Sequence, residues 1–274
     1  MNRTPTLKIS LALGLLCMQL GCPPSADIKP TAVLAVDSLP TEPEALMKIA
    51  DEQFDSSGVG FRNAQLVLDR AVQKNATWAA SKAGFDVQWR LAKAASEQCS
   101  SDETNGCTSV LNSGLAAAKK AVELEPERVE GHYYLAQMQG FSAQAQRGGD
   151  VKPLVLQVVQ EAELATKLDP KFDYAGPHRL LGTIFARAPA PPVAVGDPEK
   201  AVQHLQNAVG IAADFPPNQV CLAEAQIADE RYQDAEATLQ TAQKLLANPK
   251  WDKKRDVWKE SLSKVQRKLR AKQN

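Results

Sequence analysis

From Glu44 to the C-terminus, apolar residues recur at spacings of three and four positions, which is the periodicity of one helix face. Alanine, leucine, glutamine, glutamate and lysine fill most of these segments, and all five favour helices. Glycine and proline gather at a few places and mark breaks between helices. The pattern predicts an all-α chain with a last helix at 251–271, preceded by five helix pairs: 44–56 with 61–74, 78–98 with 108–124, 128–146 with 151–168, 175–187 with 198–212, and 218–229 with 232–247.

A short motif repeats along the second helix of each of these pairs. The frame Ala-x3-Leu-x2-Ala begins at Ala64, Ala201 and Ala235, and the last two copies are 34 residues apart. Looser copies begin at Gly114 and Val158, and each ends before a proline in a similar phrase, Val-Glu-Leu-Glu-Pro or Thr-Lys-Leu-Asp-Pro. Self-similarity at this period indicates a helical-repeat protein.

The first helix of several pairs carries a large apolar residue directly before a small one, at Leu135-Ala136, Leu181-Gly182 and Leu222-Ala223. The small residue lets the second helix approach closely. The large-small pair followed by the alanine frame resembles the tetratricopeptide repeat, most strongly over residues 197–246. The resemblance implies a TPR-like α-solenoid of about five helical hairpins over residues 44–247.

Residues 248–274 predict a basic C-terminal capping helix. Its apolar residues form one stripe, whereas the segment from Lys250 to Lys272 holds ten Lys or Arg against three acids. A solenoid needs a terminal unit with a polar outer face, which favours the capping role. A basic patch that touches anionic lipid headgroups is the alternative. The stripe consists of Trp251, Trp258, Leu262, Val265 and Leu269.

The first 22 residues are typical of a secretory signal. Arg3 and Lys8 precede an apolar run that is too short to span a membrane, and the segment ends in Gln-Leu-Gly-Cys22. This ending resembles the bacterial lipobox, which implies that residues 1–22 are a lipoprotein signal peptide and that Cys22 is lipidated. Ordinary cleavage nearby, with Cys22 as a free thiol, is the alternative. Pro23 after Cys22 favours the outer over the inner membrane of a bacterial cell envelope, because the Asp that commonly retains lipoproteins at the inner membrane is absent.

Residues 23–43 contain five prolines and predict an extended linker between the anchor and the helices. Removal of the signal takes away two basic residues and no acidic one, which leaves 30 basic against 32 acidic residues. This near-neutral balance argues against nucleic acid as a partner.

Three further cysteines follow Cys22. Cys99 and Cys107 bracket a polar loop, and disulfides persist in exported proteins. A bridge between them would join two consecutive helices and stabilise the fold by roughly 2–3 kcal/mol. Two unpaired thiols are the alternative, and a metal site lacks a second ligand pair. Cys221 lies on an apolar helix face and is expected in the core.

No catalytic or cofactor-binding motif is present: the chain has no phosphate-binding loop, no Gly-x-Ser-x-Gly elbow and no His-Glu-x2-His helix. The histidines, His132, His178 and His204, fall on three predicted helices. Two of them could meet in space, but structural or surface roles are favoured over metal ligation. The sequence therefore predicts a non-enzymatic protein without cofactor or metal.

The hairpin around residues 174–201 carries a more specific resemblance. Tyr174-Ala-Gly-Pro-His-Arg-Leu-Leu-Gly182 precedes a proline-rich loop and then Gly196-Asp-Pro-Glu-Lys-Ala201. With the earlier phrase Val-Glu-Gly-His-Tyr-Tyr-Leu-Ala136, this is similar to the T component of TRAP transporter systems (the TatT family). The resemblance implies a periplasmic lipoprotein that assembles with a solute-binding subunit. The loop itself, residues 188–196, is either a tolerated insertion or a lid over a cleft.

Two functions follow from these expectations. The first is a protein–protein scaffold whose concave face is formed by the first helix of each hairpin. The second is a carrier for a small ligand, such as an organic acid or a lipid, with a pocket or pore through the stack. A homo-oligomer is compatible with either function. The residues expected on the concave face are His132, Tyr133, Gln137, His178, Arg179 and Gln226.

Overall fold

The computed structural model describes residues 38–54, 59–101, 107–146 and 150–273. These residues form twelve α-helices and short 3-10 helices and contain no strand. The first helices are α1 (Pro43–Phe54), α2 (Val59–Lys74), α3 (Ala76–Ala80), η2 (Lys82–Gly84), α4 (Phe85–Ser101), α5 (Thr108–Leu124) and α6 (Val129–Ala145). The remaining ones are α7 (Lys152–Leu168), α8 (Phe172–Arg187), α9 (Pro198–Ile211), α10 (Pro216–Ala228), α11 (Tyr232–Leu245), η3 (Pro249–Lys254) and α12 (Arg255–Gln273).

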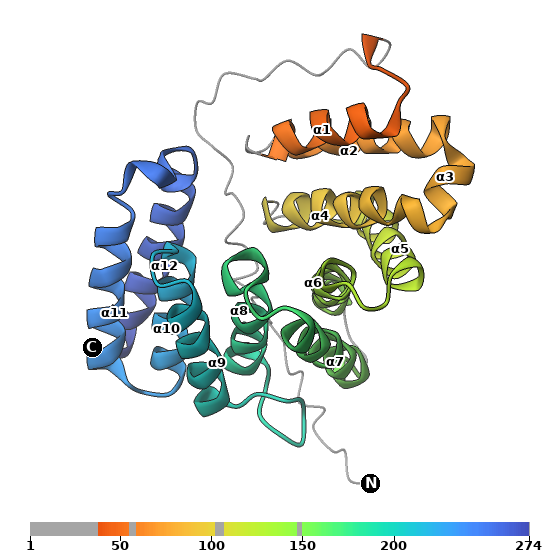
Figure 1. Ribbon diagram of the computed structural model, residues 1–274. Coiled ribbons are helices and arrows are strands. Elements are labelled where there is room, and N and C mark those ends of the chain that lie inside the picture. The colour runs from red at the N-terminus through yellow and green to blue at the C-terminus, as the bar shows by residue number, and fades with distance from the viewer. Residues whose placement is uncertain (1–37, 55–58, 102–106, 147–149, 274) are drawn as a thin grey trace, which may run out of the picture.

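Consecutive helices pack as hairpins, α1 with α2, α4 with α5, α6 with α7, α8 with α9, and α10 with α11. Each hairpin also packs on the next, and α12 closes the row against α10 and α11. Figure 1 shows the row as an open arc, with α1 and α2 at one end and α11 and α12 at the other. The predicted all-α solenoid of five hairpins with a C-terminal helix is confirmed.

The alanine frame forms the contact surface within each hairpin. On α9, Ala201, Leu205 and Ala208 are fully buried. Gly182 on α8 lies directly opposite, and a Cβ atom there would come within 2.4 Å of the Leu205 Cγ atom. The small residue of the large-small pair is therefore required by the close approach of the two helices, and the buried leucine contributes about 1.5–3 kcal/mol.

The prediction of one helix over 78–98 is wrong, because the chain breaks between α3 and α4. Ser81 adopts an extended conformation, and its backbone N–H bonds to the Trp78 carbonyl oxygen. Gly84 lies against α3, where a Cβ atom would come within 2.2 Å of the Ala79 carbonyl oxygen. The α3 turn packs onto Gly84 and α4 begins afterwards, so the local contact overrides the helical propensity of the surrounding residues.

The C-terminal segment also divides, into η3 and α12. All five residues of the predicted apolar stripe are buried, with Trp251 on η3 and the other four on α12. They pack in one hydrophobic cluster with residues of α10 and α11, including Val220 and Leu239. On α12, Lys259, Arg267, Arg270 and Lys272 are exposed, whereas Lys268 forms an ion pair with α10.

That ion pair belongs to a buried cluster that joins three helices. Glu224 on α10 accepts from Arg187 on α8 and, at 3.1 Å, from Lys268 on α12. The side chains of Arg187 and Glu224 are each 5% exposed. A buried carboxylate needs such partners because removing a charge from water is costly.

Cys99 at the end of α4 and Cys107 before α5 form a disulfide, with their Cα atoms 4.4 Å apart. The bond joins the two helices of this hairpin. Cys221 is a buried free cysteine on α10. Cys22, the predicted signal peptide at 1–22 and linker residues 23–37 lie outside the described residues. Among the helices of the described part, none is both long and apolar enough to cross a bilayer.

Candidate functional site

A cavity of about 380 Å³ opens on the inner side of the arc. One wall is formed by α4, α6 and α8, and the other by η3 and the start of α12. Phe54 at the end of α1 and Pro217 on α10 complete the rim. We refer to this space as the concave cavity. It brings together residues from nearly the whole length of the described chain.

The floor of the concave cavity contains an unusual backbone turn at the start of α8. Asp173, Tyr174 and Ala175 have positive φ angles of 49°, 55° and 64°. Each costs energy for a residue with a Cβ atom, and three in succession persist only when their surroundings hold them. Gly176 follows, and a Cβ atom there would come within 2.7 Å of the Tyr133 hydroxyl. Pro177 then starts the regular helix in the first turn, where proline is favoured.

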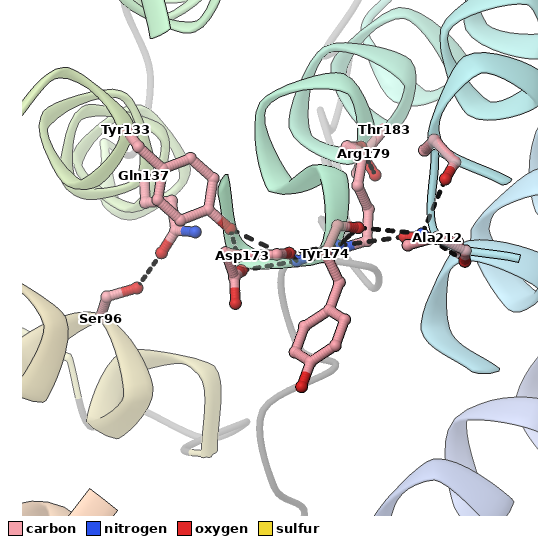
Figure 2. Close-up of polar contacts among 10 residues, drawn as sticks. Ser96, Tyr133, Gln137, Asp173, Tyr174, Arg179, Thr183 and Ala212 are labelled. Atoms are coloured by element: carbon pink, nitrogen blue, oxygen red, sulfur yellow. Dashed lines mark hydrogen bonds and ion pairs between the residues drawn. The ribbon is translucent and has the colours of Figure 1, made fainter. Parts of the chain in front are cut away.

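Arg179 holds this turn in place. Its guanidinium donates to the carbonyl oxygens of Asp173 and Tyr174 at 3.2 Å and to the Asp173 carboxylate at 2.7 Å. It also donates to the Asn218 side-chain oxygen on α10, at 3.0 Å, and to the Tyr133 hydroxyl on α6, at 3.4 Å. Figure 2 shows these bonds converging from α6, α8 and α10. The planar guanidinium, with several donors in a fixed fork, suits this task.

Asn218 completes the network from the other side. Its amide nitrogen donates to the Tyr174 carbonyl oxygen at 3.0 Å and to the Ala208 carbonyl oxygen at 3.1 Å. Asn218 is fully buried. The turn is therefore bound to the end of α9 as well as to α10, and its shape is set by residues from three hairpins.

Two groups of this network, Tyr133 and Arg179, have shifted pKa values. Burial raises the pKa of Tyr133 well above its usual value and the Asp173 carboxylate adds to the rise, so the phenol stays neutral. Its hydroxyl donates to Asp173 at 2.7 Å. Burial opposes the charged form of Arg179, but the Tyr133 oxygen and Asp173 outweigh it and raise the pKa. The guanidinium is accordingly charged at every physiological pH.

Four aromatic rings form one side of the concave cavity, and we call them the aromatic wall. Tyr174 stacks on Phe215 with ring centroids 4.4 Å apart. Trp251 lies edge-on to both of these rings, at 5.8 and 5.6 Å, and to Trp258 at 5.3 Å. Tyr174 remains 43% exposed, whereas the other three are mostly buried. The left-handed turn thus presents one flat aromatic ring to the open side.

Several lysine side chains line the concave cavity. The Lys93 ammonium on α4 lies 4.3 Å from the Phe54 ring centroid, and that of Lys254 lies 5.1 Å from the Phe61 ring centroid. Lys250 pairs with Asp214 at 2.9 Å and lies over the Trp251 ring. The Lys254–Phe61 contact joins η3 to α2, so the two ends of the arc approach each other at this edge.

The structure brings together three of the six residues predicted on the concave face. Tyr133, Gln137 and Arg179 line the concave cavity. Gln137 accepts a hydrogen bond from Ser96, which connects α6 to α4 (Figure 2). Tyr133 and Arg179 are engaged in the network of the turn, so their first role is to position the floor and Tyr174.

The placement of His132 on the concave face is wrong. One position before Tyr133, it points toward the neighbouring helix, since successive helical residues differ by about a quarter turn. Its ring nitrogens contact the Glu161 carboxylate on α7 at 2.6 Å and the Pro126 carbonyl oxygen at 2.8 Å. Burial opposes protonation, yet these two acceptors outweigh it and raise the pKa of His132.

The placement of Gln226 is also wrong. It lies on α10, where every residue from Pro216 to Ile227 is buried between α8, α9, α11 and α12. Gln226 itself is 5% exposed. A helix that is buried on all sides has no exposed polar face, so its sequence does not show which residues face the inside of the arc.

His178 likewise does not reach the concave cavity but faces His204 across the α8–α9 hairpin. Their Nδ1 atoms are 3.2 Å apart, so one ring donates to the other. Burial lowers the pKa of His178. Burial, the His178 ring and Lys200 lower the pKa of His204 to about 4. Within the described residues, no cluster of three or more potential metal ligands occurs.

Acid is expected to weaken the hairpin through His204. Because its pKa is lower in the folded protein, about 4, than in the unfolded chain, about 6.5, the unfolded state binds more protons between these values. The contribution of His204 is complete above pH 6.5 and is lost as the pH falls to 4. Urea unfolding at pH 7.5 and 4.5 should show a smaller pH-dependent loss of stability in His204→Gln than in the wild type. Equal losses in the two proteins would contradict the assignment.

Loop 188–196 does not cover the concave cavity, since none of its residues lines it. The loop closes on itself through the Gly196 N–H, which bonds to the Pro189 carbonyl oxygen at 2.8 Å. Lys152 at the start of α7 donates to the Pro192 carbonyl oxygen at 2.9 Å. The loop is therefore attached to α7, away from the aromatic wall.

The sequence interpretation missed Tyr174, Phe215 and Lys93 as lining residues and assigned Trp251 only to the capping stripe. The tryptophan stripe was visible, but its helical spacing indicated only burial. The signal that could have identified Tyr174 is Tyr-Ala-Gly-Pro before a helix, where glycine and proline permit an irregular entry. No local pattern connects that turn with α12.

Comparison with known proteins supports the repeat assignment. Residues 193–255 match the tetratricopeptide repeat family model. No curated protein matches the sequence. Among solved structures, the chain is similar to TTC0263, a thermophilic TPR protein of Thermus thermophilus, with a TM-score of 0.60 and 18% identity over 81% of this chain and 99% of that one.

Two MamA structures are more distant. One, described as MamA protein, has a TM-score of 0.46 and 13% identity over 74% of this chain and 91% of that one. The other, the MamA RS-1 ArsTM double mutant, has a TM-score of 0.49 and 11% identity over 76% of this chain and 96% of that one. Neither the tetratricopeptide repeat model nor TTC0263 indicates a catalytic family. The chain therefore contains a segment, residues 193–255, that matches the tetratricopeptide repeat model, and this segment lies inside an all-α solenoid with the fold of a TPR protein.

Proposed function

We propose that this protein is a membrane-anchored scaffold that binds a protein partner in the concave cavity. The observation that carries the proposal is the aromatic wall on the inner side of the arc, whose exposed ring, Tyr174, is presented by a turn that Arg179 and Asn218 hold in place. Tetratricopeptide solenoids bind partners on extended concave surfaces. Exposed aromatic rings in a preformed hollow are typical anchors of protein interfaces.

The proposal includes the cellular setting. Lipidation of Cys22 would hold the protein at the periplasmic side of a bacterial membrane, with the outer membrane favoured. The resemblance around Tyr174 to Ala201 supports the more specific role of T component in a TRAP-type solute transport system, with a periplasmic solute-binding subunit as the partner. This role requires no catalytic residue.

A photocrosslinking amino acid at position 174 tests the scaffold. Tyr174 is 43% exposed and lines the concave cavity, so a benzophenone there lies within reach of a bound partner. We expect a crosslinked protein in membrane preparations from cells that express the full chain. The matched control carries the same group at Glu236, an exposed position on α11. Equal crosslinking from both positions, or none from position 174, would contradict the proposal.

The same cells test the anchor. The wild type should sediment with membranes and Cys22→Ser should not, because one reactive cysteine carries the lipid. Sedimentation of both proteins would remove the lipid anchor from the proposal and leave the scaffold in place.

A small-ligand carrier is the second candidate, favoured by the size of the cavity. Its volume of about 380 Å³ lies within the usual range for ligand pockets. A ligand that binds the folded state raises the melting temperature. Thermal-shift measurements with organic acids and lipids would support this function if one class raised the melting temperature and the crosslinking experiment found no partner.

A further inference from the structure

We infer that the partner of the concave cavity is an acidic peptide segment that carries an aromatic or apolar side chain. This inference rests on the proposed scaffold function and adds the chemistry of what is bound. The anchor side chain stacks on the aromatic wall, and the carboxylates of the same segment face Lys93 and Lys254. Four observations support it: the charge of the lining, the contacts of these two lysines, the shape of the aromatic wall, and the size of the cavity.

The lining of the concave cavity carries more positive than negative charge. Its cationic residues are Lys93, Arg179, Lys250, Lys253 and Lys254, and its acidic residues are Glu97 and Asp173. Arg179 and Asp173 neutralise one another at 2.7 Å. Lys250 pairs with Asp214. Lys93 and Lys254 against Glu97 still leave a surplus of cations on the lining, although the chain as a whole has no formal net charge. A concave surface of one sign concentrates ligands of the opposite sign.

Lys93 and Lys254 are placed to receive carboxylates. Among the described residues, neither forms an ion pair; each ammonium instead lies over a phenylalanine ring, Phe54 or Phe61. The two rings lie at the end of α1 and near the start of α2, so the same hairpin tip orients both cations. A cation held over a ring keeps its charge available, since the ring supplies only a weak partner. Carboxylates in the cavity would provide the stronger one.

The aromatic wall accounts for the apolar part of the ligand. Tyr174 stacks on Phe215 and remains 43% exposed. Trp251 lies edge-on beside it, and the Lys250 ammonium lies over both rings, 4.4 Å from the Trp251 centroid and 5.7 Å from the Tyr174 centroid. The two rings form a corner at the cavity, with one cation at its edge. A flat or branched apolar side chain placed there would complete an aromatic cluster of the kind that adds affinity beyond buried area.

The size of the cavity favours a peptide over a single small anion. Its volume would hold roughly a dozen water molecules at about 30 Å³ each, which exceeds what one carboxylate fills. Lys93 is on α4, whereas Tyr174 lies at the start of α8 and Phe215 directly precedes α10. Lys93 and the stacked pair therefore belong to different helices. An extended segment can contact both at once.

Fluorescence anisotropy tests the inference directly. The probe is a fluorescein-labelled peptide of about twelve residues that contains four glutamates and one phenylalanine among glycines and serines. The matched probe replaces each glutamate by glutamine. We expect the acidic peptide to bind the full chain at low salt and to lose affinity as salt is raised, because ionic contacts near a surface are screened. The glutamine peptide should bind at least tenfold more weakly.

Charge-reversal variants locate the site. Lys93→Glu combined with Lys254→Glu should weaken binding of the acidic peptide by about tenfold or more. Lys119→Glu combined with Lys244→Glu makes the same charge change at exposed positions on α5 and α11, outside the cavity, and should retain most of the affinity. If the first variant has a lowered melting temperature, Lys93→Gln combined with Lys254→Gln replaces it. The affinity for the acidic peptide should then fall at least threefold.

Each outcome decides the inference. Equal binding of the acidic and glutamine peptides, or equal losses in the two charge-reversal variants, overturns it. Binding of phenylacetate without binding of the acidic peptide also overturns it and favours the small-ligand carrier. A protein crosslinked from position 174, together with no affinity for the acidic peptide, leaves the scaffold standing and removes only the acidic segment. Selective, salt-sensitive binding that the cavity lysines control supports it.

Discussion

Glu224→Ala is expected to lower the free energy of unfolding by about 3–5 kcal/mol. The substitution leaves the Arg187 guanidinium, whose side chain is 5% exposed, without its carboxylate inside the α8–α10 interface. It also releases Lys268 on α12, which is half-exposed and loses little. Arg187, Glu224 and Lys268 belong to α8, α10 and α12. The loss of stability should therefore affect the whole C-terminal half of the solenoid. Urea denaturation monitored by circular dichroism measures it.

Two companion variants separate the buried charge from the loss of a side chain. Arg187→Met combined with Glu224→Leu should recover most of the stability, since apolar residues of similar volume often replace a buried ion pair without loss. Glu236→Ala, on the exposed face of α11, is the matched control and should change stability by less than about 0.5 kcal/mol. A change below about 1 kcal/mol in Glu224→Ala would show that water reaches the pair.

Arg179→Ala is expected to be the second most damaging change, with a loss of about 3–4 kcal/mol in the free energy of unfolding. Arg179 makes six hydrogen bonds, three of them to main-chain carbonyls of the left-handed turn. Without them, only the bonds from Asn218 to the Tyr174 carbonyl oxygen and from Tyr133 to the Asp173 carboxylate, among the side-chain bonds described above, remain to offset the strain of three consecutive positive φ angles. The Asp173 carboxylate would also lose its cation.

The turn gives this variant a second readout. Tyr174 should leave its stacked position on Phe215, and the near-ultraviolet circular dichroism of the aromatic wall should decrease at temperatures where the helices remain folded. Arg179→Lys should restore little, because a single ammonium cannot bond the carbonyls, Asp173 and Asn218 together. Arg231→Ala removes an exposed ion pair with Asp234 and serves as the control, with a loss of at most about 1 kcal/mol. An unchanged aromatic signal in Arg179→Ala would show that the turn holds without Arg179.

The helices and their pairing could be predicted because both depend on local pattern. The frame that begins at Ala201 and Ala235 specifies which face of each second helix is buried, and the small residue at Gly182 specifies close packing. The break between α3 and α4 could not be predicted. It depends on the close approach of Gly84 to Ala79, and hydrophobic periodicity carries no information about such a contact.

The sequence alone therefore determined the all-α solenoid, its five hairpins and the apolar stripe that starts at Trp251. These features depend on helical periodicity, which can be read from the order of neighbouring residues. Only the tertiary structure decided which side chains face the cavity. Curvature of the row brings Lys254 of η3 to Phe61 of α2 and turns Tyr174 toward Trp251. These neighbours are far apart in the chain, and their distance depends on the summed packing angles of every hairpin between them. The sequence of a single segment does not contain these packing angles. His132 and Gln226 were therefore as suitable for the concave face as Tyr133 when judged by sequence.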